Sequence, residues 1–190
     1  MKVVEIFDSM QGEGRYMGVM STFVRFAGCN LDCPFCDEKA KYSKAKEMTI
    51  EEIAAQCIYT TVVLTGGEPT LQPALGLLVK HLHAEGHSVH VETNGTAFVP
   101  SEVDWITCSP KAPEYAVTPN GCNEMKLVVD EALSLDKAIS LAQNVRCRVW
   151  LQPCDGPKIE ESKRRILEWI RKYPILFRAG IQLHKWYEVI

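Results

Sequence analysis

The sequence has no block of basic residues, no long apolar run and no low-complexity segment. Lys and Arg number 21 against 24 Asp and Glu, and the formal net charge of −3 gives no reason to expect nucleic acid as a partner. No apolar run approaches the roughly 18 residues that a membrane-spanning helix needs, so no membrane contact is expected. No secretory signal is recognisable, because Met1 leads directly into a predicted strand at residues 3–7. A cytoplasmic location is therefore expected.

The composition is that of an ordinary globular protein, 46% hydrophobic and 24% charged. A chain of 190 residues suffices for one well-buried domain but not for two comfortable ones. Neither an internal repeat nor a linker divides it. A single domain over residues 1–190 is predicted.

Alternating strand and helix patterns predict an α/β fold. The predicted strands suit burial on both faces, as in parallel sheets. They lie at residues 3–7, 22–26, 61–64, 88–92, 105–108, 123–129, 147–151 and 180–183. Helical spacing and end signals predict helices at residues 49–57, 72–85, 134–143 and 158–172. Such units form either an open sheet or a partial barrel.

Two polar loops without predicted helices interrupt the alternation, at residues 8–18 and 27–46. The first is rich in glycine and the second contains clustered cysteines. In parallel α/β folds the ligand lies beyond the carboxyl ends of the strands. Because each loop follows a predicted strand, both are expected on the same rim of the sheet.

Three of the eight cysteines, Cys29, Cys33 and Cys36, have the spacing C-x-x-x-C-x-x-C. Without a secretory signal such a cluster indicates a metal or redox site rather than disulfides. Three thiolates can bind three corners of a cubane iron–sulfur cluster and leave the fourth iron open. The alternative is zinc, which needs four ligands, and no second close Cys/His pair occurs. The remaining cysteines, interpreted as small apolar core residues, are Cys57, Cys108, Cys122, Cys147 and Cys154.

A second motif, Thr65-Gly66-Gly67-Glu68-Pro69-Thr70, follows the predicted strand at residues 61–64. Paired glycines let a ligand approach the backbone closely. Glu68 could accept a hydrogen bond from an ammonium group. Taken alone, however, Glu68 is explained more simply as an acid that caps a strand-to-helix turn.

Together, the cysteine loop and this glycine–glycine–glutamate turn resemble the radical S-adenosylmethionine (SAM) superfamily. The resemblance implies a [4Fe-4S] cluster on the three cysteines, with the amino and carboxylate groups of SAM on the open iron. Gly66, Gly67 and Glu68 would hold the amino group. One electron from the cluster would then cleave SAM to a 5′-deoxyadenosyl radical.

A narrower resemblance runs along nearly the whole chain, to the 7-carboxy-7-deazaguanine synthase family. The matching segments are residues 11–14, 23–31, 36–37, 65–72, 92–96, 109–111, 124–126, 151–153, 155–157 and 181–185. The resemblance implies a truncated radical SAM barrel of about six parallel strands with few helices, working as a homodimer. It implies conversion of 6-carboxy-5,6,7,8-tetrahydropterin to 7-carboxy-7-deazaguanine, with ring contraction and loss of ammonia, on the route to 7-deazapurine nucleosides such as queuosine. A flavodoxin-type or ferredoxin-type electron donor is expected as a partner.

The resemblance also assigns individual residues to the two ligands. The implied SAM contacts are Phe35, Asp37, Gly66, Gly67, Glu68, Glu92, Asn94, Ser109, Lys111 and Gln152. The implied contacts to the pterin substrate are Gln11, Gly12, Glu13, Gly14, Arg25, Thr65, Gln182, His184, Lys185 and Ile190. A planar guanidinium suits a bidentate contact with the substrate carboxylate, although a structural ion pair is the commoner role of an arginine. Thr-Asn-Gly after Glu92 is also ordinary turn chemistry.

Glu38 departs from the family. The family usually has Thr or Ser directly after Cys-Asp, and that hydroxyl binds a Mg²⁺ ion that also contacts the substrate carboxylate. Carboxylates are equally hard oxygen ligands, so Glu38 is predicted to bind Mg²⁺ directly. The alternative is an enzyme that does not use magnesium.

Three other functions stay open. One is a different radical SAM enzyme, such as a glycyl-radical activase, which would not need the pterin-type residues at 11–14 and 182–185. Another is a non-enzymatic zinc or iron–sulfur module, which the open-iron cysteine count and the turn at residues 66–69 disfavour. The third is a family member diverted to a regulatory task.

Overall fold

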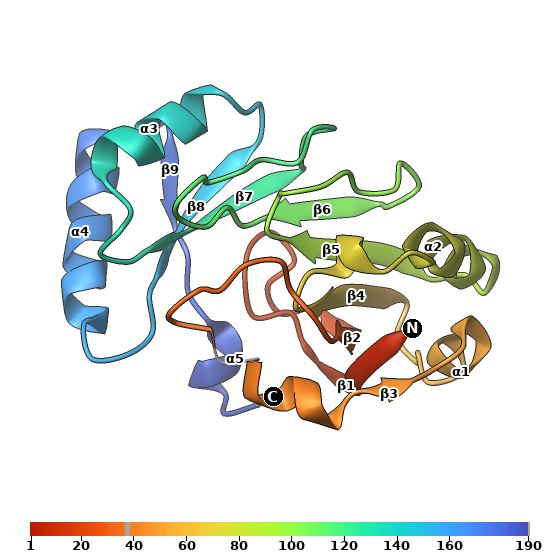
Figure 1. The fold of residues 1–190 in the computed structure, drawn as a ribbon. Helices are drawn as coiled ribbons and strands as arrows, with labels where there is room; N and C mark the ends of the chain where they lie inside the picture. The colour runs from red at the N-terminus through yellow and green to blue at the C-terminus, as the bar shows by residue number, and fades with distance from the viewer. Residues whose placement is uncertain (37–38, 190) are drawn as a thin grey trace.

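The computed structural model describes residues 1–36 and 39–189, and these form one curved sheet of nine strands (Figure 1). The strand order is β3-β1-β2-β4-β5-β6-β7-β8-β9. The strands are β1 (Lys2–Met10), β2 (Met20–Phe26), β3 (Lys46–Glu47), β4 (Thr61–Gly66), β5 (Ser88–Thr93), β6 (Trp105–Cys108), β7 (Glu124–Val129), β8 (Arg148–Pro153) and β9 (Phe177–Ala179). All neighbours from β2 to β9 are parallel, whereas β1 and β3 are antiparallel additions at one edge. The predicted α/β fold with a mostly parallel, partly closed sheet is confirmed.

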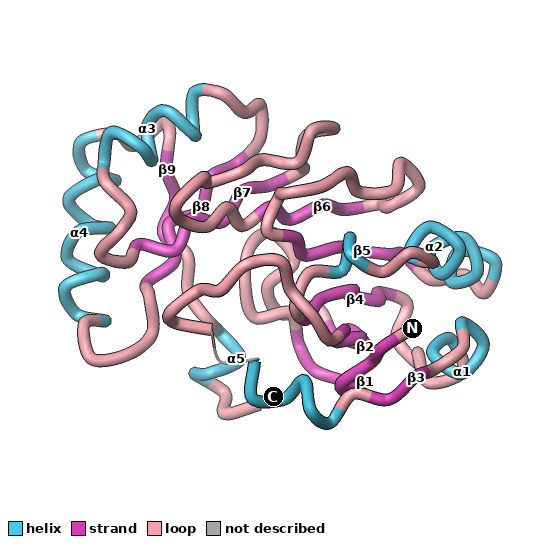
Figure 2. The backbone as a smooth tube through the Cα atoms, in the orientation of Figure 1, coloured by secondary structure: helices cyan, strands magenta, loops and turns pink. Residues whose placement is uncertain are grey.

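Four helices pack at the two ends of the sheet, whereas the short C-terminal helix lies between these ends, among loops (Figure 2). The helices are α1 (Ile50–Ala54), α2 (Leu75–Ala84), α3 (Leu135–Gln143), α4 (Ile159–Lys172) and α5 (Leu183–Trp186), with 3-10 turns η1 (Lys39–Lys44) and η2 (Pro69–Leu71). One apolar core joins α1 and α2 to β2, β4 and β5, and a second joins α3 and α4 to β7, β8 and β9. None of the helices in the described part of the chain is long and apolar enough to cross a bilayer.

Alternation along the strands separates the core from the site. On β7, Met125 and Leu127 are fully buried in the second core. Glu124 and Lys126 alternate with them and therefore point to the opposite, inner face of the sheet. The inner face is thus polar although the strands are buried on both sides.

Predicted helix ends are mostly where the capping signals put them. Thr49 forms the expected capping box with Glu52, but α1 ends at Ala54 rather than at residue 57. Ser134 caps α3 by accepting a hydrogen bond from the backbone of Lys137. The predicted helix at 72–85 begins only at Leu75, because Gln72 is the extended C-cap of η2 and Pro73 follows it.

The predicted strand at residues 180–183 is wrong. The last strand is β9, Phe177–Ala179, and residues 183–186 form α5 instead. Phe177 is fully buried and anchors the strand in the second core, whereas Ile181 is 49% exposed. The backbone N–H of Leu183 donates to the Gly12 carbonyl at 2.8 Å, so this segment is bonded to the glycine loop and does not continue the sheet.

The prediction that both polar loops start from the same rim is also wrong. Because β1 is antiparallel to β2, Met10 pairs with Met20 and the glycine loop lies at the amino end of β2. The loop then turns into the sheet's inner side, where Gly14 is so close to Glu124 that an added Cβ would lie 2.2 Å from its carboxylate oxygen. The glycine loop therefore approaches the cysteine loop from the opposite end of the sheet.

Candidate functional site

A polar cavity of about 450 Å³ lies at the carboxyl ends of the parallel strands. It is bounded by the cysteine loop and by the residues at the ends of β4, β5 and β8. The predicted site residues that line it are Glu13, Cys29, Cys33, Phe35, Cys36, Thr65, Gly66, Gly67, Glu92, Asn94, Ser109, Lys111, Gln152, Gln182 and Lys185. The structure thus brings residues from both ends of the chain to one place.

The three loop cysteines are free thiols at the cavity wall. The Sγ of Cys29 accepts hydrogen bonds from the Leu31 backbone at 3.4 Å and from the Asn94 amide at 3.8 Å. The pKa of Cys33 is raised, mainly by burial and further by the neighbouring thiols of Cys29 and Cys36. The Lys111 ammonium opposes this effect. Three thiols on the wall of one cavity, with N–H donors and a cation nearby, have the chemistry that suits an iron–sulfur cluster.

Gly67 allows the turn after β4 to pack against the cysteine loop. Its N–H donates to the Phe26 carbonyl at 2.9 Å, and the next N–H, of Glu68, donates to the Gly28 carbonyl at 2.8 Å. A Cβ on Gly67 would lie 1.8 Å from the Gly28 oxygen. Glycine is needed here because backbone meets backbone.

Glu68 is fully buried and does not line the cavity. Its carboxylate accepts hydrogen bonds from the Thr70 backbone and hydroxyl, from the Thr93 hydroxyl at 2.7 Å and from the Asn94 backbone at 2.7 Å. Both oxygens therefore join the glycine turn to the end of β5. This is the capping role that the sequence alone suggests, and a direct contact with SAM stays a prediction.

Lys111 and Ser109, which follow the end of β6, lie together on the cavity wall. The Lys111 ammonium donates to the Ser109 carbonyl at 2.7 Å and to its hydroxyl. Burial, and next to it repulsion from Lys126, lowers the pKa of Lys111 to about 8. A half-buried lysine near Cys33, when it is protonated, offsets negative charge that a thiolate would bring.

A network of hydrogen bonds and ion pairs forms the inner wall of the cavity. Lys126 of β7 forms an ion pair with Glu13 of the glycine loop and another, at 2.9 Å, with Glu92 of β5. The Gln11 amide donates to Glu92 at 2.9 Å and the Gln182 amide donates to Glu13 at 2.9 Å. Lys126 lies in one of the segments that match the family, but no role was predicted for it. The sequence signal that could have identified it is a lysine that alternates with apolar residues inside a buried strand.

Arg25 does not line the cavity. Its Nε donates to Glu5 at 2.8 Å, and its guanidinium lies 5.3 Å from the centre of the Phe7 ring. The side chain is 15% exposed, so it is largely packed in this arrangement. The structure shows the ion-pair role for Arg25, and its contact with a substrate carboxylate stays a prediction.

The C-terminal segment closes one side of the cavity. His184 packs on Gly12, where an added Cβ would lie 1.8 Å from the ring nitrogen, and burial lowers the pKa of His184. Lys185 forms an ion pair with Asp155, which also lines the cavity. The predicted site residues Asp37, Glu38 and Ile190 lie outside the described residues.

The other cysteines are only partly the core residues expected. Cys57 and Cys108 are buried, but the thiols of Cys122 and Cys147 lie 3.5 Å apart and are partly exposed. Cys154 lines the cavity, a position that its isolated place in the sequence did not indicate. Other lining residues without a predicted role are Leu31, Tyr42, Thr93, Lys126, Val128, Pro153, Asp155 and Gly156.

Comparison with known proteins agrees with this geometry. The model of the radical SAM superfamily matches residues 23–123. The chain is 39% identical to a 7-carboxy-7-deazaguanine synthase of Bradyrhizobium diazoefficiens, over 96% of both chains. It is 35% identical to the protein of that name from Bacteroides thetaiotaomicron, over 97% of this chain and 96% of the other.

A solved structure has the same fold. The crystal structure of QueE from Escherichia coli superposes with a TM-score of 0.80 at 26% identity, covering 96% of this chain and 94% of that one. Sequence and fold are therefore shared over nearly the full length. The chain belongs to the radical SAM superfamily and, within it, to the family of 7-carboxy-7-deazaguanine synthases.

Proposed function

We propose that this enzyme converts 6-carboxy-5,6,7,8-tetrahydropterin to 7-carboxy-7-deazaguanine in 7-deazapurine biosynthesis of the queuosine type. The observation that carries the proposal is a single cavity in which the three loop thiols face a polar wall containing Glu13 and Gln182. A carboxylate and an amide offer the acceptors and donors that the edge of a pterin requires. The names of the relatives support the same product.

The cofactor residues would act as a unit at the mouth of the cavity. Cys29, Cys33 and Cys36 would hold a [4Fe-4S] cluster, and Gly66, Gly67, Ser109 and Gln152 would contribute to binding SAM. When bound, cluster and SAM supply the one-electron chemistry of the superfamily. The chain's own residues then bind, orient and shield the substrate, which is where most of the rate enhancement would come from.

Several partners belong to the proposal. We propose a homodimer in the cytoplasm that receives electrons from a flavodoxin-type or ferredoxin-type protein. We also propose that Mg²⁺ binds through Glu38 and the substrate carboxylate. The support for this is the place of Glu38 in the sequence, directly after Cys36-Asp37, where the family has a residue with a hydroxyl group.

The magnesium contact is tested by chelation. Thorough removal of divalent ions should lower turnover, and added Mg²⁺ should restore it, because two carboxylates in one pocket repel without a cation. A Glu38→Ala variant should lose the response. Equal rates with and without Mg²⁺, together with an active variant, would contradict the metal contact but not the cluster.

One anaerobic assay tests the function. Protein with a reconstituted cluster is incubated with SAM, a reductant and the carboxytetrahydropterin, and the product is identified by mass spectrometry. We expect 7-carboxy-7-deazaguanine together with 5′-deoxyadenosine. Cleavage of SAM without this product would indicate a different radical SAM reaction, and failure to take up iron would indicate a zinc or non-enzymatic module.

A further inference from the structure

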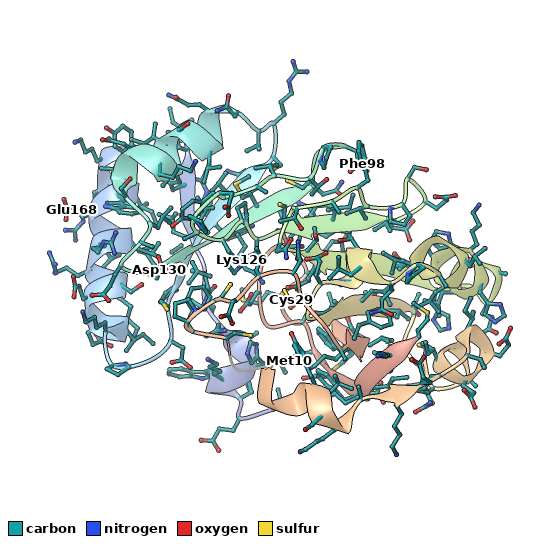
Figure 3. All side chains as sticks on the ribbon, in the orientation of Figure 1. Met10, Cys29, Phe98, Lys126, Asp130 and Glu168 are labelled. Atoms are coloured by element: carbon teal, nitrogen blue, oxygen red, sulfur yellow. The ribbon has the colours of Figure 1, made fainter. Side chains whose placement is uncertain are left out.

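Lys126 is the one buried cation that contacts both predicted ligand sides within the part of the chain that the structure describes. It is 9% exposed and points from β7 to the inner face of the sheet, near the middle of the molecule (Figure 3). Its ammonium contacts Glu13, from the loop predicted to bind the pterin, and Glu92, from the strand predicted to bind the ribose of SAM. The cysteine, glycine and terminal motifs leave this lysine without a role.

Each of the two carboxylates is held at both oxygens. Glu13 is paired with Lys126 through Oε2 and accepts from the Gln182 amide through Oε1. Glu92 is paired with Lys126 through Oε2 and accepts from the Gln11 amide through Oε1. Both carboxylates therefore have fixed orientations, and both are paired with the ammonium group of Lys126.

Charge explains why a cation is needed at this point. Among the described residues that line the cavity, the carboxylates of Glu13, Glu92 and Asp155 equal in number the ammonium groups of Lys111, Lys126 and Lys185. Glu13 and Glu92 would repel each other in a buried site without a shared partner. Burial by itself lowers the pKa of Lys126, but attraction from Glu13 and Glu92 outweighs it and the pKa is raised. Burial likewise raises the pKa of Glu92, yet Lys126 brings it below its ordinary value.

We propose that Lys126 is a positioning residue that sets the spacing between the pterin and SAM by holding Glu13 and Glu92 in one arrangement. The inference rests on the proposed function, because it takes Glu13 as a substrate contact and Glu92 as a ribose contact. In the structure the Lys126 ammonium contacts these two carboxylates. Its effect reaches the ligands through the two carboxylates.

Binding measurements without turnover are the first test. Protein with an oxidised cluster, which cannot cleave SAM, is titrated calorimetrically with SAM and separately with the carboxytetrahydropterin. Lys126→Met removes the charge at similar length, and we expect both affinities to fall by about tenfold or more, as loss of a charge-assisted contact implies. Lys158→Met is the matched control, since Lys158 also pairs with a carboxylate, Glu131, but is exposed and is not among the residues that line the cavity. It should bind both ligands as the wild type does.

Turnover supplies a readout that a merely structural ion pair would not change. With a reductant present, we expect Lys126→Met to release more 5′-deoxyadenosine per product formed than the wild type, because the two ligands are no longer held at the correct spacing. Lys126→Arg keeps the charge but changes the reach; it should fold, retain part of both affinities and show an intermediate ratio. Should Lys126→Met fail to fold, the Arg variant carries the test.

Three outcomes would overturn the proposal. They are unchanged affinities, loss of affinity for one ligand alone, and an unchanged ratio of 5′-deoxyadenosine to product in the Arg variant. Failure of the proposed function is distinguishable. A wild-type protein that binds SAM but makes no product from the pterin contradicts the function, whereas the variants above are judged against a wild type that does.

Discussion

Individual polar residues in the middle of buried strands mark the functional side of this sheet. Glu92 and Lys126 alternate with fully buried Val91, Met125 and Leu127. Placing charged groups inside a protein is costly unless they are paired. Here Glu92 of β5 and Lys126 of β7 pair with each other across the intervening strand β6. Their pairing is what makes a polar cavity compatible with a stable sheet.

The cysteine assignment is testable one residue at a time. Replacing Cys29, Cys33 or Cys36 singly with Ala should abolish cluster absorption and SAM cleavage, because three thiolates leave no spare ligand. The same change at Cys122 or Cys147 should leave about four irons per chain, as three protein thiolates plus SAM require. Iron content and visible absorption after anaerobic reconstitution measure the difference. Loss of iron on removal of Cys122 or Cys147 would show that the assignment is wrong.

Arg25 distinguishes a ligand contact from a structural ion pair. In Arg25→Lys the charge remains but the planar fork is lost, so a bidentate contact with the substrate carboxylate should weaken by about 1–3 kcal/mol. The affinity for the pterin should fall accordingly, while SAM cleavage without substrate stays close to that of the wild type. An unchanged substrate affinity would leave Arg25 with the pairing to Glu5 that the structure shows.

At the scale of elements, the turn between β4 and η2 joins the cofactor loops to the sheet. Its backbone bonds to the start of the cysteine loop, and its buried Glu68 bonds to the end of β5. Three segments far apart in the sequence thus share one small packing unit. The two glycines serve this contact as much as any ligand.

Gly67→Ala should damage that unit. The added Cβ would meet the Gly28 carbonyl, so backbone must move, and overpacking of this kind costs about 1–3 kcal/mol or more. We expect a lower free energy of unfolding in urea and weaker retention of iron. Gly76→Ala is the control, because its Cβ meets nothing nearer than 3.8 Å and a helical alanine is favoured over glycine. Equal behaviour of the two variants would contradict the close-approach argument.

At the scale of the whole molecule, the glycine loop fills the inner side of the sheet at the amino ends of its strands. Tyr16 of this loop packs on His90 at 4.4 Å between ring centres and edge-on against Trp105 at 5.0 Å. The glycine loop therefore covers part of the inner side of the sheet, and α5, which lies between the two helix-covered ends of the sheet in Figure 1, is joined to this loop by the hydrogen bond from Leu183 to Gly12. Substrate can be enclosed although the sheet does not close on itself.

This packing makes the stability of the folded chain depend on pH. His90 is 5% exposed, and burial lowers its pKa, with Asp104 and Glu92 opposing the effect. Below pH of about 6.5 the unfolded chain binds a proton that folded His90 does not. The free energy of unfolding should therefore fall as pH falls, by up to about 1.4 kcal/mol per pH unit for one proton.

Urea unfolding between pH 5 and 7 measures this slope. His90→Gln removes the titrating group and should flatten the dependence. The same slope in the wild type and in His90→Gln would assign the acid sensitivity to other groups.

The sequence by itself determined those features of this protein that depend on interactions between residues close together in the chain. The spacing of Cys29, Cys33 and Cys36 follows from one loop that must present three thiols. The helix starts at Thr49 and Ser134 follow from side chains that accept hydrogen bonds from the backbone three residues later. Most strands could be predicted as well, because a run of apolar residues is also a local signal.

Only the tertiary structure decided which distant groups meet. Glu13 and Lys126 lie 113 residues apart in the chain, and Gln182 and Glu13 lie 169 apart. No local pattern encodes such a contact, because it exists only once β1 pairs antiparallel to β2 and turns the glycine loop inward. For the same reason residues 180–183 follow that loop and do not extend the sheet as their apolar pattern predicts. Strand direction and loop docking depend on the packing of the whole chain, and so the cavity's inner wall could be seen only in the folded molecule.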